Sequence, residues 1–252
     1  VSMKLNASIN RMQGVSNNIQ NAISYLDVQD GVMQGASSIV SRMAELKALS
    51  QDVLKNSSDI ANYNTEFKNL QVQLYQISQE TFNGVSLFAS DSASGTFGTS
   101  VVNVTIFTSD KGAAGSIVSL GKALLVSALT FASTTSTAAA AAASGGNTKS
   151  LAKSASGTAV SIGELGISFF NKALENISSL RATSAAGMAR LQLSEDHARL
   201  TVANLEAANS RIMDIDVAEE STRFAKYNIL TQASAAMLSQ ANQATTTALM
   251  LL

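Results

Sequence analysis

The stretch FNKALENISSLRATSAAGMARLQLSEDHARLTVANLEAANSRI, residues 170–212, decides the fold because apolar or small residues return at every seventh position. The repeat consists of Phe170, Ile177, Ser184, Leu191, Ala198, Leu205 and Ile212. The rows beside it contain Ala173, Leu174, Leu180, Met188 and Val202. A sustained seven-residue repeat is typical of a helix that packs against another helix along a seam. We therefore expect a long helix that begins near Ile162 or Glu164. Its buried seam should include Leu191, Leu205 and Ile212.

A second long helical pattern runs from the first residue to about Val53. Its apolar stripe consists of Leu5, Ile9, Met12, Ile19, Ile23, Leu26, Met33, Val40, Met43 and Leu46. At about 1.5 Å per residue, a helix of about fifty residues extends over ~75 Å. Antiparallel pairing of the two long helices would bring the two ends of the chain together.

A shorter helix is expected after the turn at residues 56–59, with Ser58 or Asp59 as its cap. Its apolar stripe consists of Ile60, Tyr63, Phe67, Leu70, Leu74 and Ile77. The sequence Phe82-Asn83-Gly84 should end this helical region, because an Asn-Gly pair favours a turn with positive φ.

The middle of the chain has a different character. Residues 85–88 and 101–107 are short β-like runs that suggest a hairpin or small sheet. The run 117–131 fits either a strand or a short helix, and we favour a helix near residues 120–129. Residues 133–161 are dominated by Ser, Thr, Ala and Gly. Because such a segment has little large apolar surface to bury, we expect it to be exposed and dispensable for folding.

The tail of the chain is amphipathic but carries no charge after Lys226. Its apolar residues recur at steps of three and four, which is the spacing of one helix face. The face includes Leu230, Ala233, Met237, Leu238, Ala241 and Leu249. An uncharged helix of this kind needs other helices to cover it in water. The tail therefore indicates a polymer subunit or a chaperone client rather than an enzyme.

The composition argues against most other functions. A net charge of −1 and a pI near 5.9 provide no basic field for nucleic acid or an anionic membrane. Cysteine is absent and His197 is the only histidine, so neither a thiolate nor a transition-metal site is expected. No glycine-rich phosphate-binding pattern occurs. Glu219 and Glu220, with Arg223 three or four residues later, are best interpreted as a polar junction or an ion pair. We therefore expect no catalytic, cofactor-binding or metal-binding residues, and no enzyme.

Three segments together resemble bacterial flagellin. They are INRMQGVSNNIQNAISYLDVQDGVMQGASSIVSRMAELKALSQD at residues 9–52, QISQETFNGVSLF at residues 76–88 and SRIMDIDVAEESTRFAKYNILTQASAAMLSQANQ at residues 210–243. The first looks like that family's long initial helix with its R-x-x-E-L motif, and the last resembles its carboxyl-terminal signature. The chain starts without Met and in the middle of a helical pattern. We therefore expect it to lack the family's most amino-terminal segment, which forms part of the filament core.

The resemblance implies a mainly α fold: a long antiparallel coiled-coil-like helical rod with a small β-hairpin and an irregular middle region. Residues 1–112 would form the amino-terminal part of the rod domain with the β-hairpin. Residues 113–162 would form a variable, surface-exposed middle rich in Ser, Thr and Ala. Residues 163–212 would supply the carboxyl-terminal long helix of the rod, and residues 213–252 the filament-core helix.

The resemblance also implies the function and the partners. The chain would be exported to the extracellular flagellum and polymerise with itself into the filament that drives swimming. Before export, a chaperone of the FliS kind would cover the apolar face of the tail, and the filament cap and hook-junction proteins would be further partners. The rod surface of some flagellins is recognised by Toll-like receptor 5, and the matching positions here are Arg42, Leu46 and Glu66. The alternatives are a hook–filament junction protein and a secreted coiled-coil adaptor or adhesin.

Overall fold

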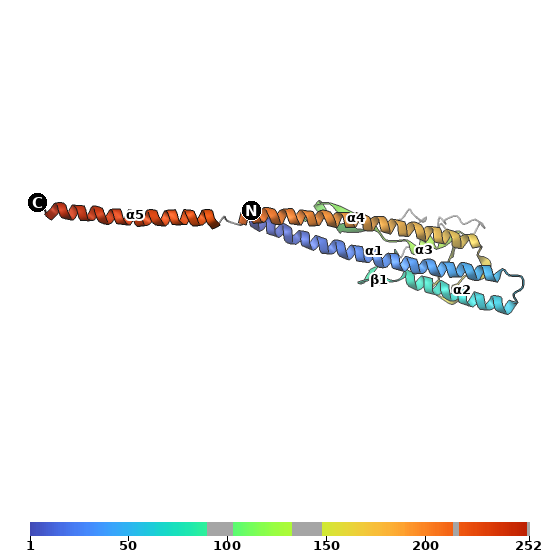
Figure 1. The fold of residues 1–252 in the computed structure, drawn as a ribbon. Coiled ribbons are helices and arrows are strands. Elements are labelled where there is room, and N and C mark those ends of the chain that lie inside the picture. The colour runs from blue at the N-terminus through green and yellow to red at the C-terminus, as the bar shows by residue number, and fades with distance from the viewer. Residues whose placement is uncertain (90–102, 133–147, 214–216, 251–252) are drawn as a thin grey trace. The chain divides into compact units, whose positions relative to one another are not determined.

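The computed structural model describes residues 1–89, 103–132, 148–213 and 217–250, and helices dominate it (Figure 1). The α-helices are α1 (Ser2–Ser50), α2 (Ser57–Ser78), α3 (Leu125–Ala128), α4 (Ile167–Met213) and α5 (Val217–Met250). The strands are β1 (Thr81–Phe82), β2 (Val85–Ser86), β3 (Asn103–Phe107), β4 (Ile117–Gly121), β5 (Thr130–Ala132) and β6 (Thr148–Ser150). Short 3-10 turns lie at Gly112–Ala114, Ser156–Thr158 and Ile162–Glu164. The mainly α fold class is thus confirmed.

The chain divides into two compact units, which we describe separately. The larger unit comprises residues 10–201 and contains most of α1 and α4, all of α2 and all of the described strands. The smaller unit comprises residues 1–9 and 202–252 and includes α5.

Within the larger unit, α1 and α4 lie side by side in antiparallel directions (Figure 1). Near one end of the pair, the Gln20 side-chain amide donates to the Glu195 carboxylate at 2.8 Å. Further along, Arg181 Nε donates to Asp30 Oδ1 at 2.7 Å. Residue numbers therefore rise along α1 as they fall along α4, as the two apolar stripes led us to expect.

The seven-residue repeat of α4 is buried throughout the larger unit. Its buried members there are Phe170, Ile177, Ser184, Leu191 and Ala198. In the smaller unit, Leu205 is only partly buried, and Ile212 is 51% exposed, so the expected burial of Ile212 is wrong. Near this end of α4 the contacts with α1 are polar: Asn209 bonds to Ser2 and Asn6 in the first turns of α1.

Asn56 caps α2, because its side-chain oxygen accepts a hydrogen bond from the Asp59 backbone N–H at 2.8 Å. The expected caps, Ser58 and Asp59, are wrong by two or three positions, since the helix already begins at Ser57. At the far end, Asn83 and Gly84 have φ values of 50° and 78° and connect β1 to β2. This confirms the predicted turn with positive φ.

The strand partners differ from the sequence prediction. The run at 85–88 pairs with Thr81–Phe82, and β3 pairs with β4 in an antiparallel ladder. The helix expected at 120–129 is reduced to α3, because residues 117–121 and 130–132 are strands. Alternating exposed and buried residues along β4, with Val118 and Leu120 inside, produce the period of two that identifies it as a strand.

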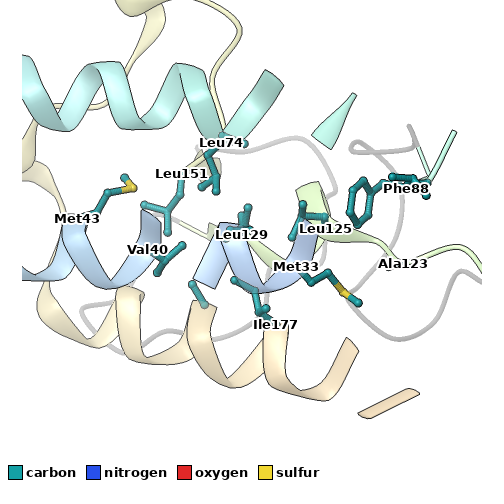
Figure 2. Packing of buried hydrophobic residues seen from close by; sticks show 14 of the residues in the cluster. Met33, Val40, Met43, Leu74, Phe88, Ala123, Leu125, Leu129, Leu151 and Ile177 are labelled. Carbon is teal, nitrogen blue, oxygen red and sulfur yellow. The ribbon is translucent and has the colours of Figure 1, made fainter. Parts of the chain in front are cut away.

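The core of the larger unit includes residues from the middle of the chain (Figure 2). Leu125, Leu129 and Leu151 pack with Met33 of α1 and Ile177 of α4. The expectation that residues 113–162 form a surface-exposed segment is therefore wrong for the described parts, 113–132 and 148–162. Small polar residues dominate the composition there, but isolated large apolar side chains anchor the backbone to the helices. Residues 133–147 lie outside the described part of the chain.

Buried polar side chains hold this irregular region in place. Gln71 of α2 donates to the Val160 carbonyl at 2.7 Å and accepts from the Val160 N–H at 3.0 Å. Asn176 of α4 donates to the Ala128 carbonyl at 3.0 Å, and Lys47 of α1 donates to the Ile162 carbonyl at 2.9 Å. Burial lowers the pKa of the Lys47 ammonium group. Segments that lack their own ladder thus obtain their hydrogen bonds from helix side chains.

Two leucines on α4 test where the seam lies. Leu191 is fully buried, whereas Leu193, two residues later, is 73% exposed. We expect Leu191→Ala to lower the free energy of unfolding by ~2–5 kcal/mol, because it leaves a cavity in the seam. Leu193→Ala should change it by less than ~0.5 kcal/mol. Urea unfolding followed by circular dichroism would measure both, and equal effects would contradict the assignment of the seam.

Candidate functional site

The described residues contain no group of three or more His, Cys, Asp or Glu side chains placed to hold a metal ion. His197 is exposed on α4. Among the described helices, none combines the length and the apolar character that a membrane crossing requires. The candidate functional features are therefore surfaces, and two of them contain residues singled out in the sequence.

The first surface lies on α5. Every side chain described on this helix, from Glu219 to Ala244, is exposed. Leu230, Met237 and Leu238 are exposed by 51%, 76% and 66%, respectively. The predicted residues Ala233 and Ala241 lie on the same face and are also exposed, while the side chain of Leu249 lies outside the described residues. We call this set the α5 apolar face: Leu230, Ala233, Met237, Leu238 and Ala241.

The charges of α5 are confined to its beginning. Arg223 Nη2 lies 3.1 Å from Glu219 Oε1, and Arg223 Nη1 lies 3.5 Å from Glu220 Oε2. This confirms the expected ion pair. The two glutamates also lie in the first turn, where the helix dipole favours negative charge. Beyond Lys226 the helix presents only uncharged polar and apolar groups.

The second surface surrounds Arg42 on α1. Arg42 Nε donates to Glu66 Oε1 of α2 at 2.8 Å, and Arg42 Nη1 donates to Glu45 Oε2 at 2.8 Å. These bonds, the one to Glu66 first, raise the pKa of the guanidinium group. The side chains of Arg42 and Glu66 are each 43% exposed, so the pair can be reached from solvent.

Of the three residues that the resemblance singled out, the structure pairs Arg42 with Glu66 and buries Leu46. Leu46 is fully buried, as is Met43 three residues before it, so both belong to the inward stripe of α1. The structure therefore does not offer Leu46 as a surface contact. It lies one turn after Arg42, about 40° further around the helix and towards Met43, where the helix packs into the core. Sequence reasoning missed Glu45, although its spacing of three from Arg42 predicts an ion pair on one helix face.

Both ends of the chain match models of one protein family. Residues 1–93 match the model described as the bacterial flagellin N-terminal helical region, and residues 167–252 match the C-terminal helical region. The two matches together take in more than two thirds of the chain.

Related proteins align over nearly the whole chain. The flagellar filament 33 kDa core protein of Treponema phagedenis is 28% identical over 254 residues, which span 100% of this chain and 83% of that protein. The flagellin of Listeria monocytogenes is 29% identical, and the aligned region spans 95% of this chain and 79% of that protein. The flagellin of Bacillus subtilis is 29% identical over 261 residues, with 96% and 81% covered.

The fold is similar to a solved flagellin structure. The crystal structure of Bacillus cereus flagellin superimposes with a TM-score of 0.50 at 21% identity, covering 72% of this chain and 88% of that one. The paired α1 and α4 helices, the α5 apolar face and the matches at both ends of the sequence thus agree: the chain belongs to the bacterial flagellin family.

Proposed function

We propose that this chain is a structural subunit of the flagellar filament and that the α5 apolar face is a surface through which copies join. The observation that carries the proposal is that every side chain described on α5 is exposed, although the helix has no charged residue beyond Lys226. Burying one leucine or methionine side chain stabilises by ~1.5–3 kcal/mol, so neighbouring copies that cover this face gain substantially. The role is structural rather than enzymatic, and its place is the extracellular flagellum.

The proposal divides the chain by role. Residues 213–252 supply the helix that lies in the filament core, while residues 1–112 and 163–212 form the helical rod outside it. The antiparallel pairing of α1 and α4 and their shared core with α2 support the second assignment. The matched flagellin regions favour this function over a hook–filament junction protein or an adhesin.

The α5 apolar face also suits a chaperone before export. An amphipathic helix is recognised by laying its apolar side into a hydrophobic groove of a partner. A chaperone of the FliS kind would cover residues 227–252 and prevent premature polymerisation. Once outside the cell, the filament cap and the hook-junction proteins would contact the same subunit at the two ends of the filament.

A second role is favoured by the exposed cluster of Arg42, Glu45 and Glu66. Charged side chains held by mutual hydrogen bonds present a fixed pattern to a partner. We propose that Toll-like receptor 5 recognises this cluster without a direct contact from Leu46. Subunits released from filaments would then be detected by a host.

The assembly surface can be tested with two substitutions on opposite sides of α5. Met237→Glu places a charge on the α5 apolar face, whereas Ser239→Glu places the same charge on the other side. In cells whose flagellin gene carries the change, we expect Met237→Glu to reduce filament length and number strongly. Ser239→Glu should have a smaller effect. Electron microscopy would measure both, and normal filaments with Met237→Glu would contradict the proposed contact.

The chaperone proposal predicts a change in hydrogen exchange. A lone helix of this length is marginal in water, so amides from about residue 216 onwards should exchange fast in the free chain. Adding the chaperone should slow exchange across residues 227–250. Amides around Met33, in the core of the larger unit, provide the control and should be protected in both states. Slow exchange of the tail in the free chain would show that the tail already has an intramolecular partner.

Receptor recognition predicts that Arg42→Ala lowers receptor activation by about tenfold, since the loss of one central arginine contact typically costs more than ~1 kcal/mol. Arg199→Ala is the matched control, because Arg199 is a 64% exposed arginine on α4 that is paired with a glutamate, Glu195. Both arginine side chains are exposed, so their ion pairs contribute little to stability and melting temperatures should barely change. A reporter-cell assay would measure receptor activation by each variant. Equal activation by the two variants would show that the receptor does not recognise the cluster.

A further inference from the structure

Two polar side chains interrupt the apolar seam between α1 and α4. Gln29 lies between Leu26 and Met33 on the stripe of α1 and is fully buried. Ser184 occupies one position of the seven-residue repeat of α4 and is 6% exposed. The Ser184 hydroxyl donates to Gln29 Oε1 at 2.8 Å. Each residue is thus the hydrogen-bond partner of the other across the seam.

The same glutamine also binds a third segment. Gln29 Nε2 donates to the Leu87 carbonyl, just after β2, at 2.6 Å. One turn earlier on α1, the Tyr25 hydroxyl donates to the carbonyls of Ser86 and Leu87 at 2.9 and 3.2 Å. Both ends of the buried Gln29 amide are therefore satisfied, and the amide joins α1, α4 and the β1–β2 hairpin.

Helices with a seven-residue repeat can pack in more than one alignment. A shift of α4 by one repeat would place Ile177 or Leu191 where Ser184 now lies. Leucine or isoleucine would fill the seam well, but neither can donate a hydrogen bond to Gln29 Oε1. A buried amide oxygen without a donor is unfavourable, so the shifted alignments are penalised at this one position even though Gln29 Nε2 keeps the Leu87 carbonyl.

We propose that Gln29 and Ser184 act together as a register-determining pair, which admits a single alignment of α1 against α4 and ties that alignment to the β1–β2 hairpin. A single buried polar residue specifies register in this way in coiled coils, at some cost in stability. The neighbouring pair of Asp30 with Arg181, at 2.7 and 3.0 Å, agrees with the same alignment. That bidentate pair is about one third exposed, so it supports the alignment from the rim of the seam while Gln29 and Ser184 act inside it.

The alignment can be measured directly because the chain has no native cysteine. Spin labels on Gln34→Cys of α1 and Gln192→Cys of α4 are placed at exposed positions of the larger unit. These positions are offset along the helix axis, so a shift of seven residues changes the axial separation by ~10 Å. In the otherwise unchanged chain, we expect one narrow distance distribution from pulsed electron paramagnetic resonance.

In the double variant Gln29→Leu/Ser184→Ala, we expect additional distances displaced by about 10 Å while the circular dichroism of the helices is retained. The two substitutions leave Tyr25 in place, so its hydroxyl can still hold the Leu87 carbonyl of the hairpin against α1. Gln71→Leu is the matched control, because it also removes a fully buried glutamine, but one that bonds to Val160 outside the seam. It should lower stability and keep the single distance.

A single undisplaced distance in the folded double variant would overturn the proposal, and so would displaced distances in the Gln71→Leu control. Ser184→Ala alone removes only one hydroxyl group and serves if the double variant does not fold. The proposal then requires a smaller displaced population in Ser184→Ala, and its absence would equally overturn the proposal.

Discussion

The larger unit depends on the burial of one continuous seam between α1 and α4. Both helices are far longer than an average globular helix, and neither could hold its shape in water without a partner. Ile19, Leu26, Met33 and Val40 of α1 supply one side, and Ile177 and Leu191 of α4 supply the other. The described segments between the two helices, residues 103–132 and 148–166, pack onto this surface, and isolated apolar residues there supply the contacts.

Polar groups inside this core determine where the irregular segments attach. Gln71, Asn176 and Lys47 each reach a backbone carbonyl of a segment that has no complete ladder of its own. Apolar contacts alone tolerate sliding, because methyl groups have no direction. Directed hydrogen bonds in a water-free interior do not tolerate sliding. A few buried polar side chains therefore determine where each segment attaches to the apolar surface.

The long helices could be predicted from sequence because their signals repeat many times. The stripe from Ile9 to Leu46 contains enough apolar residues for the helical period to be unambiguous. The turn at Asn83 and Gly84 could be predicted because glycine, unlike most residues, readily adopts positive φ. The pairing of β3 with β4 could not be predicted, because five-residue strands offer only two or three alternations. Burial of Leu151 and Val160 was missed because a composition averaged over residues 133–161 hides single anchoring residues. Leu46 was misplaced because spacing alone does not show where, within about 40° around the helix, the exposed side gives way to the buried one.

The lack of charge on α5 after Lys226 has a consequence for how the proposed contact between copies would respond to salt and acid. Dissolved ions weaken attraction between charges by gathering around them, and protons act only on groups that titrate. The α5 apolar face contains neither kind of group, so a joint made from it presents nothing for salt or acid to neutralise. If copies join through this face, as proposed, charge screening and protonation should change the strength of that contact little.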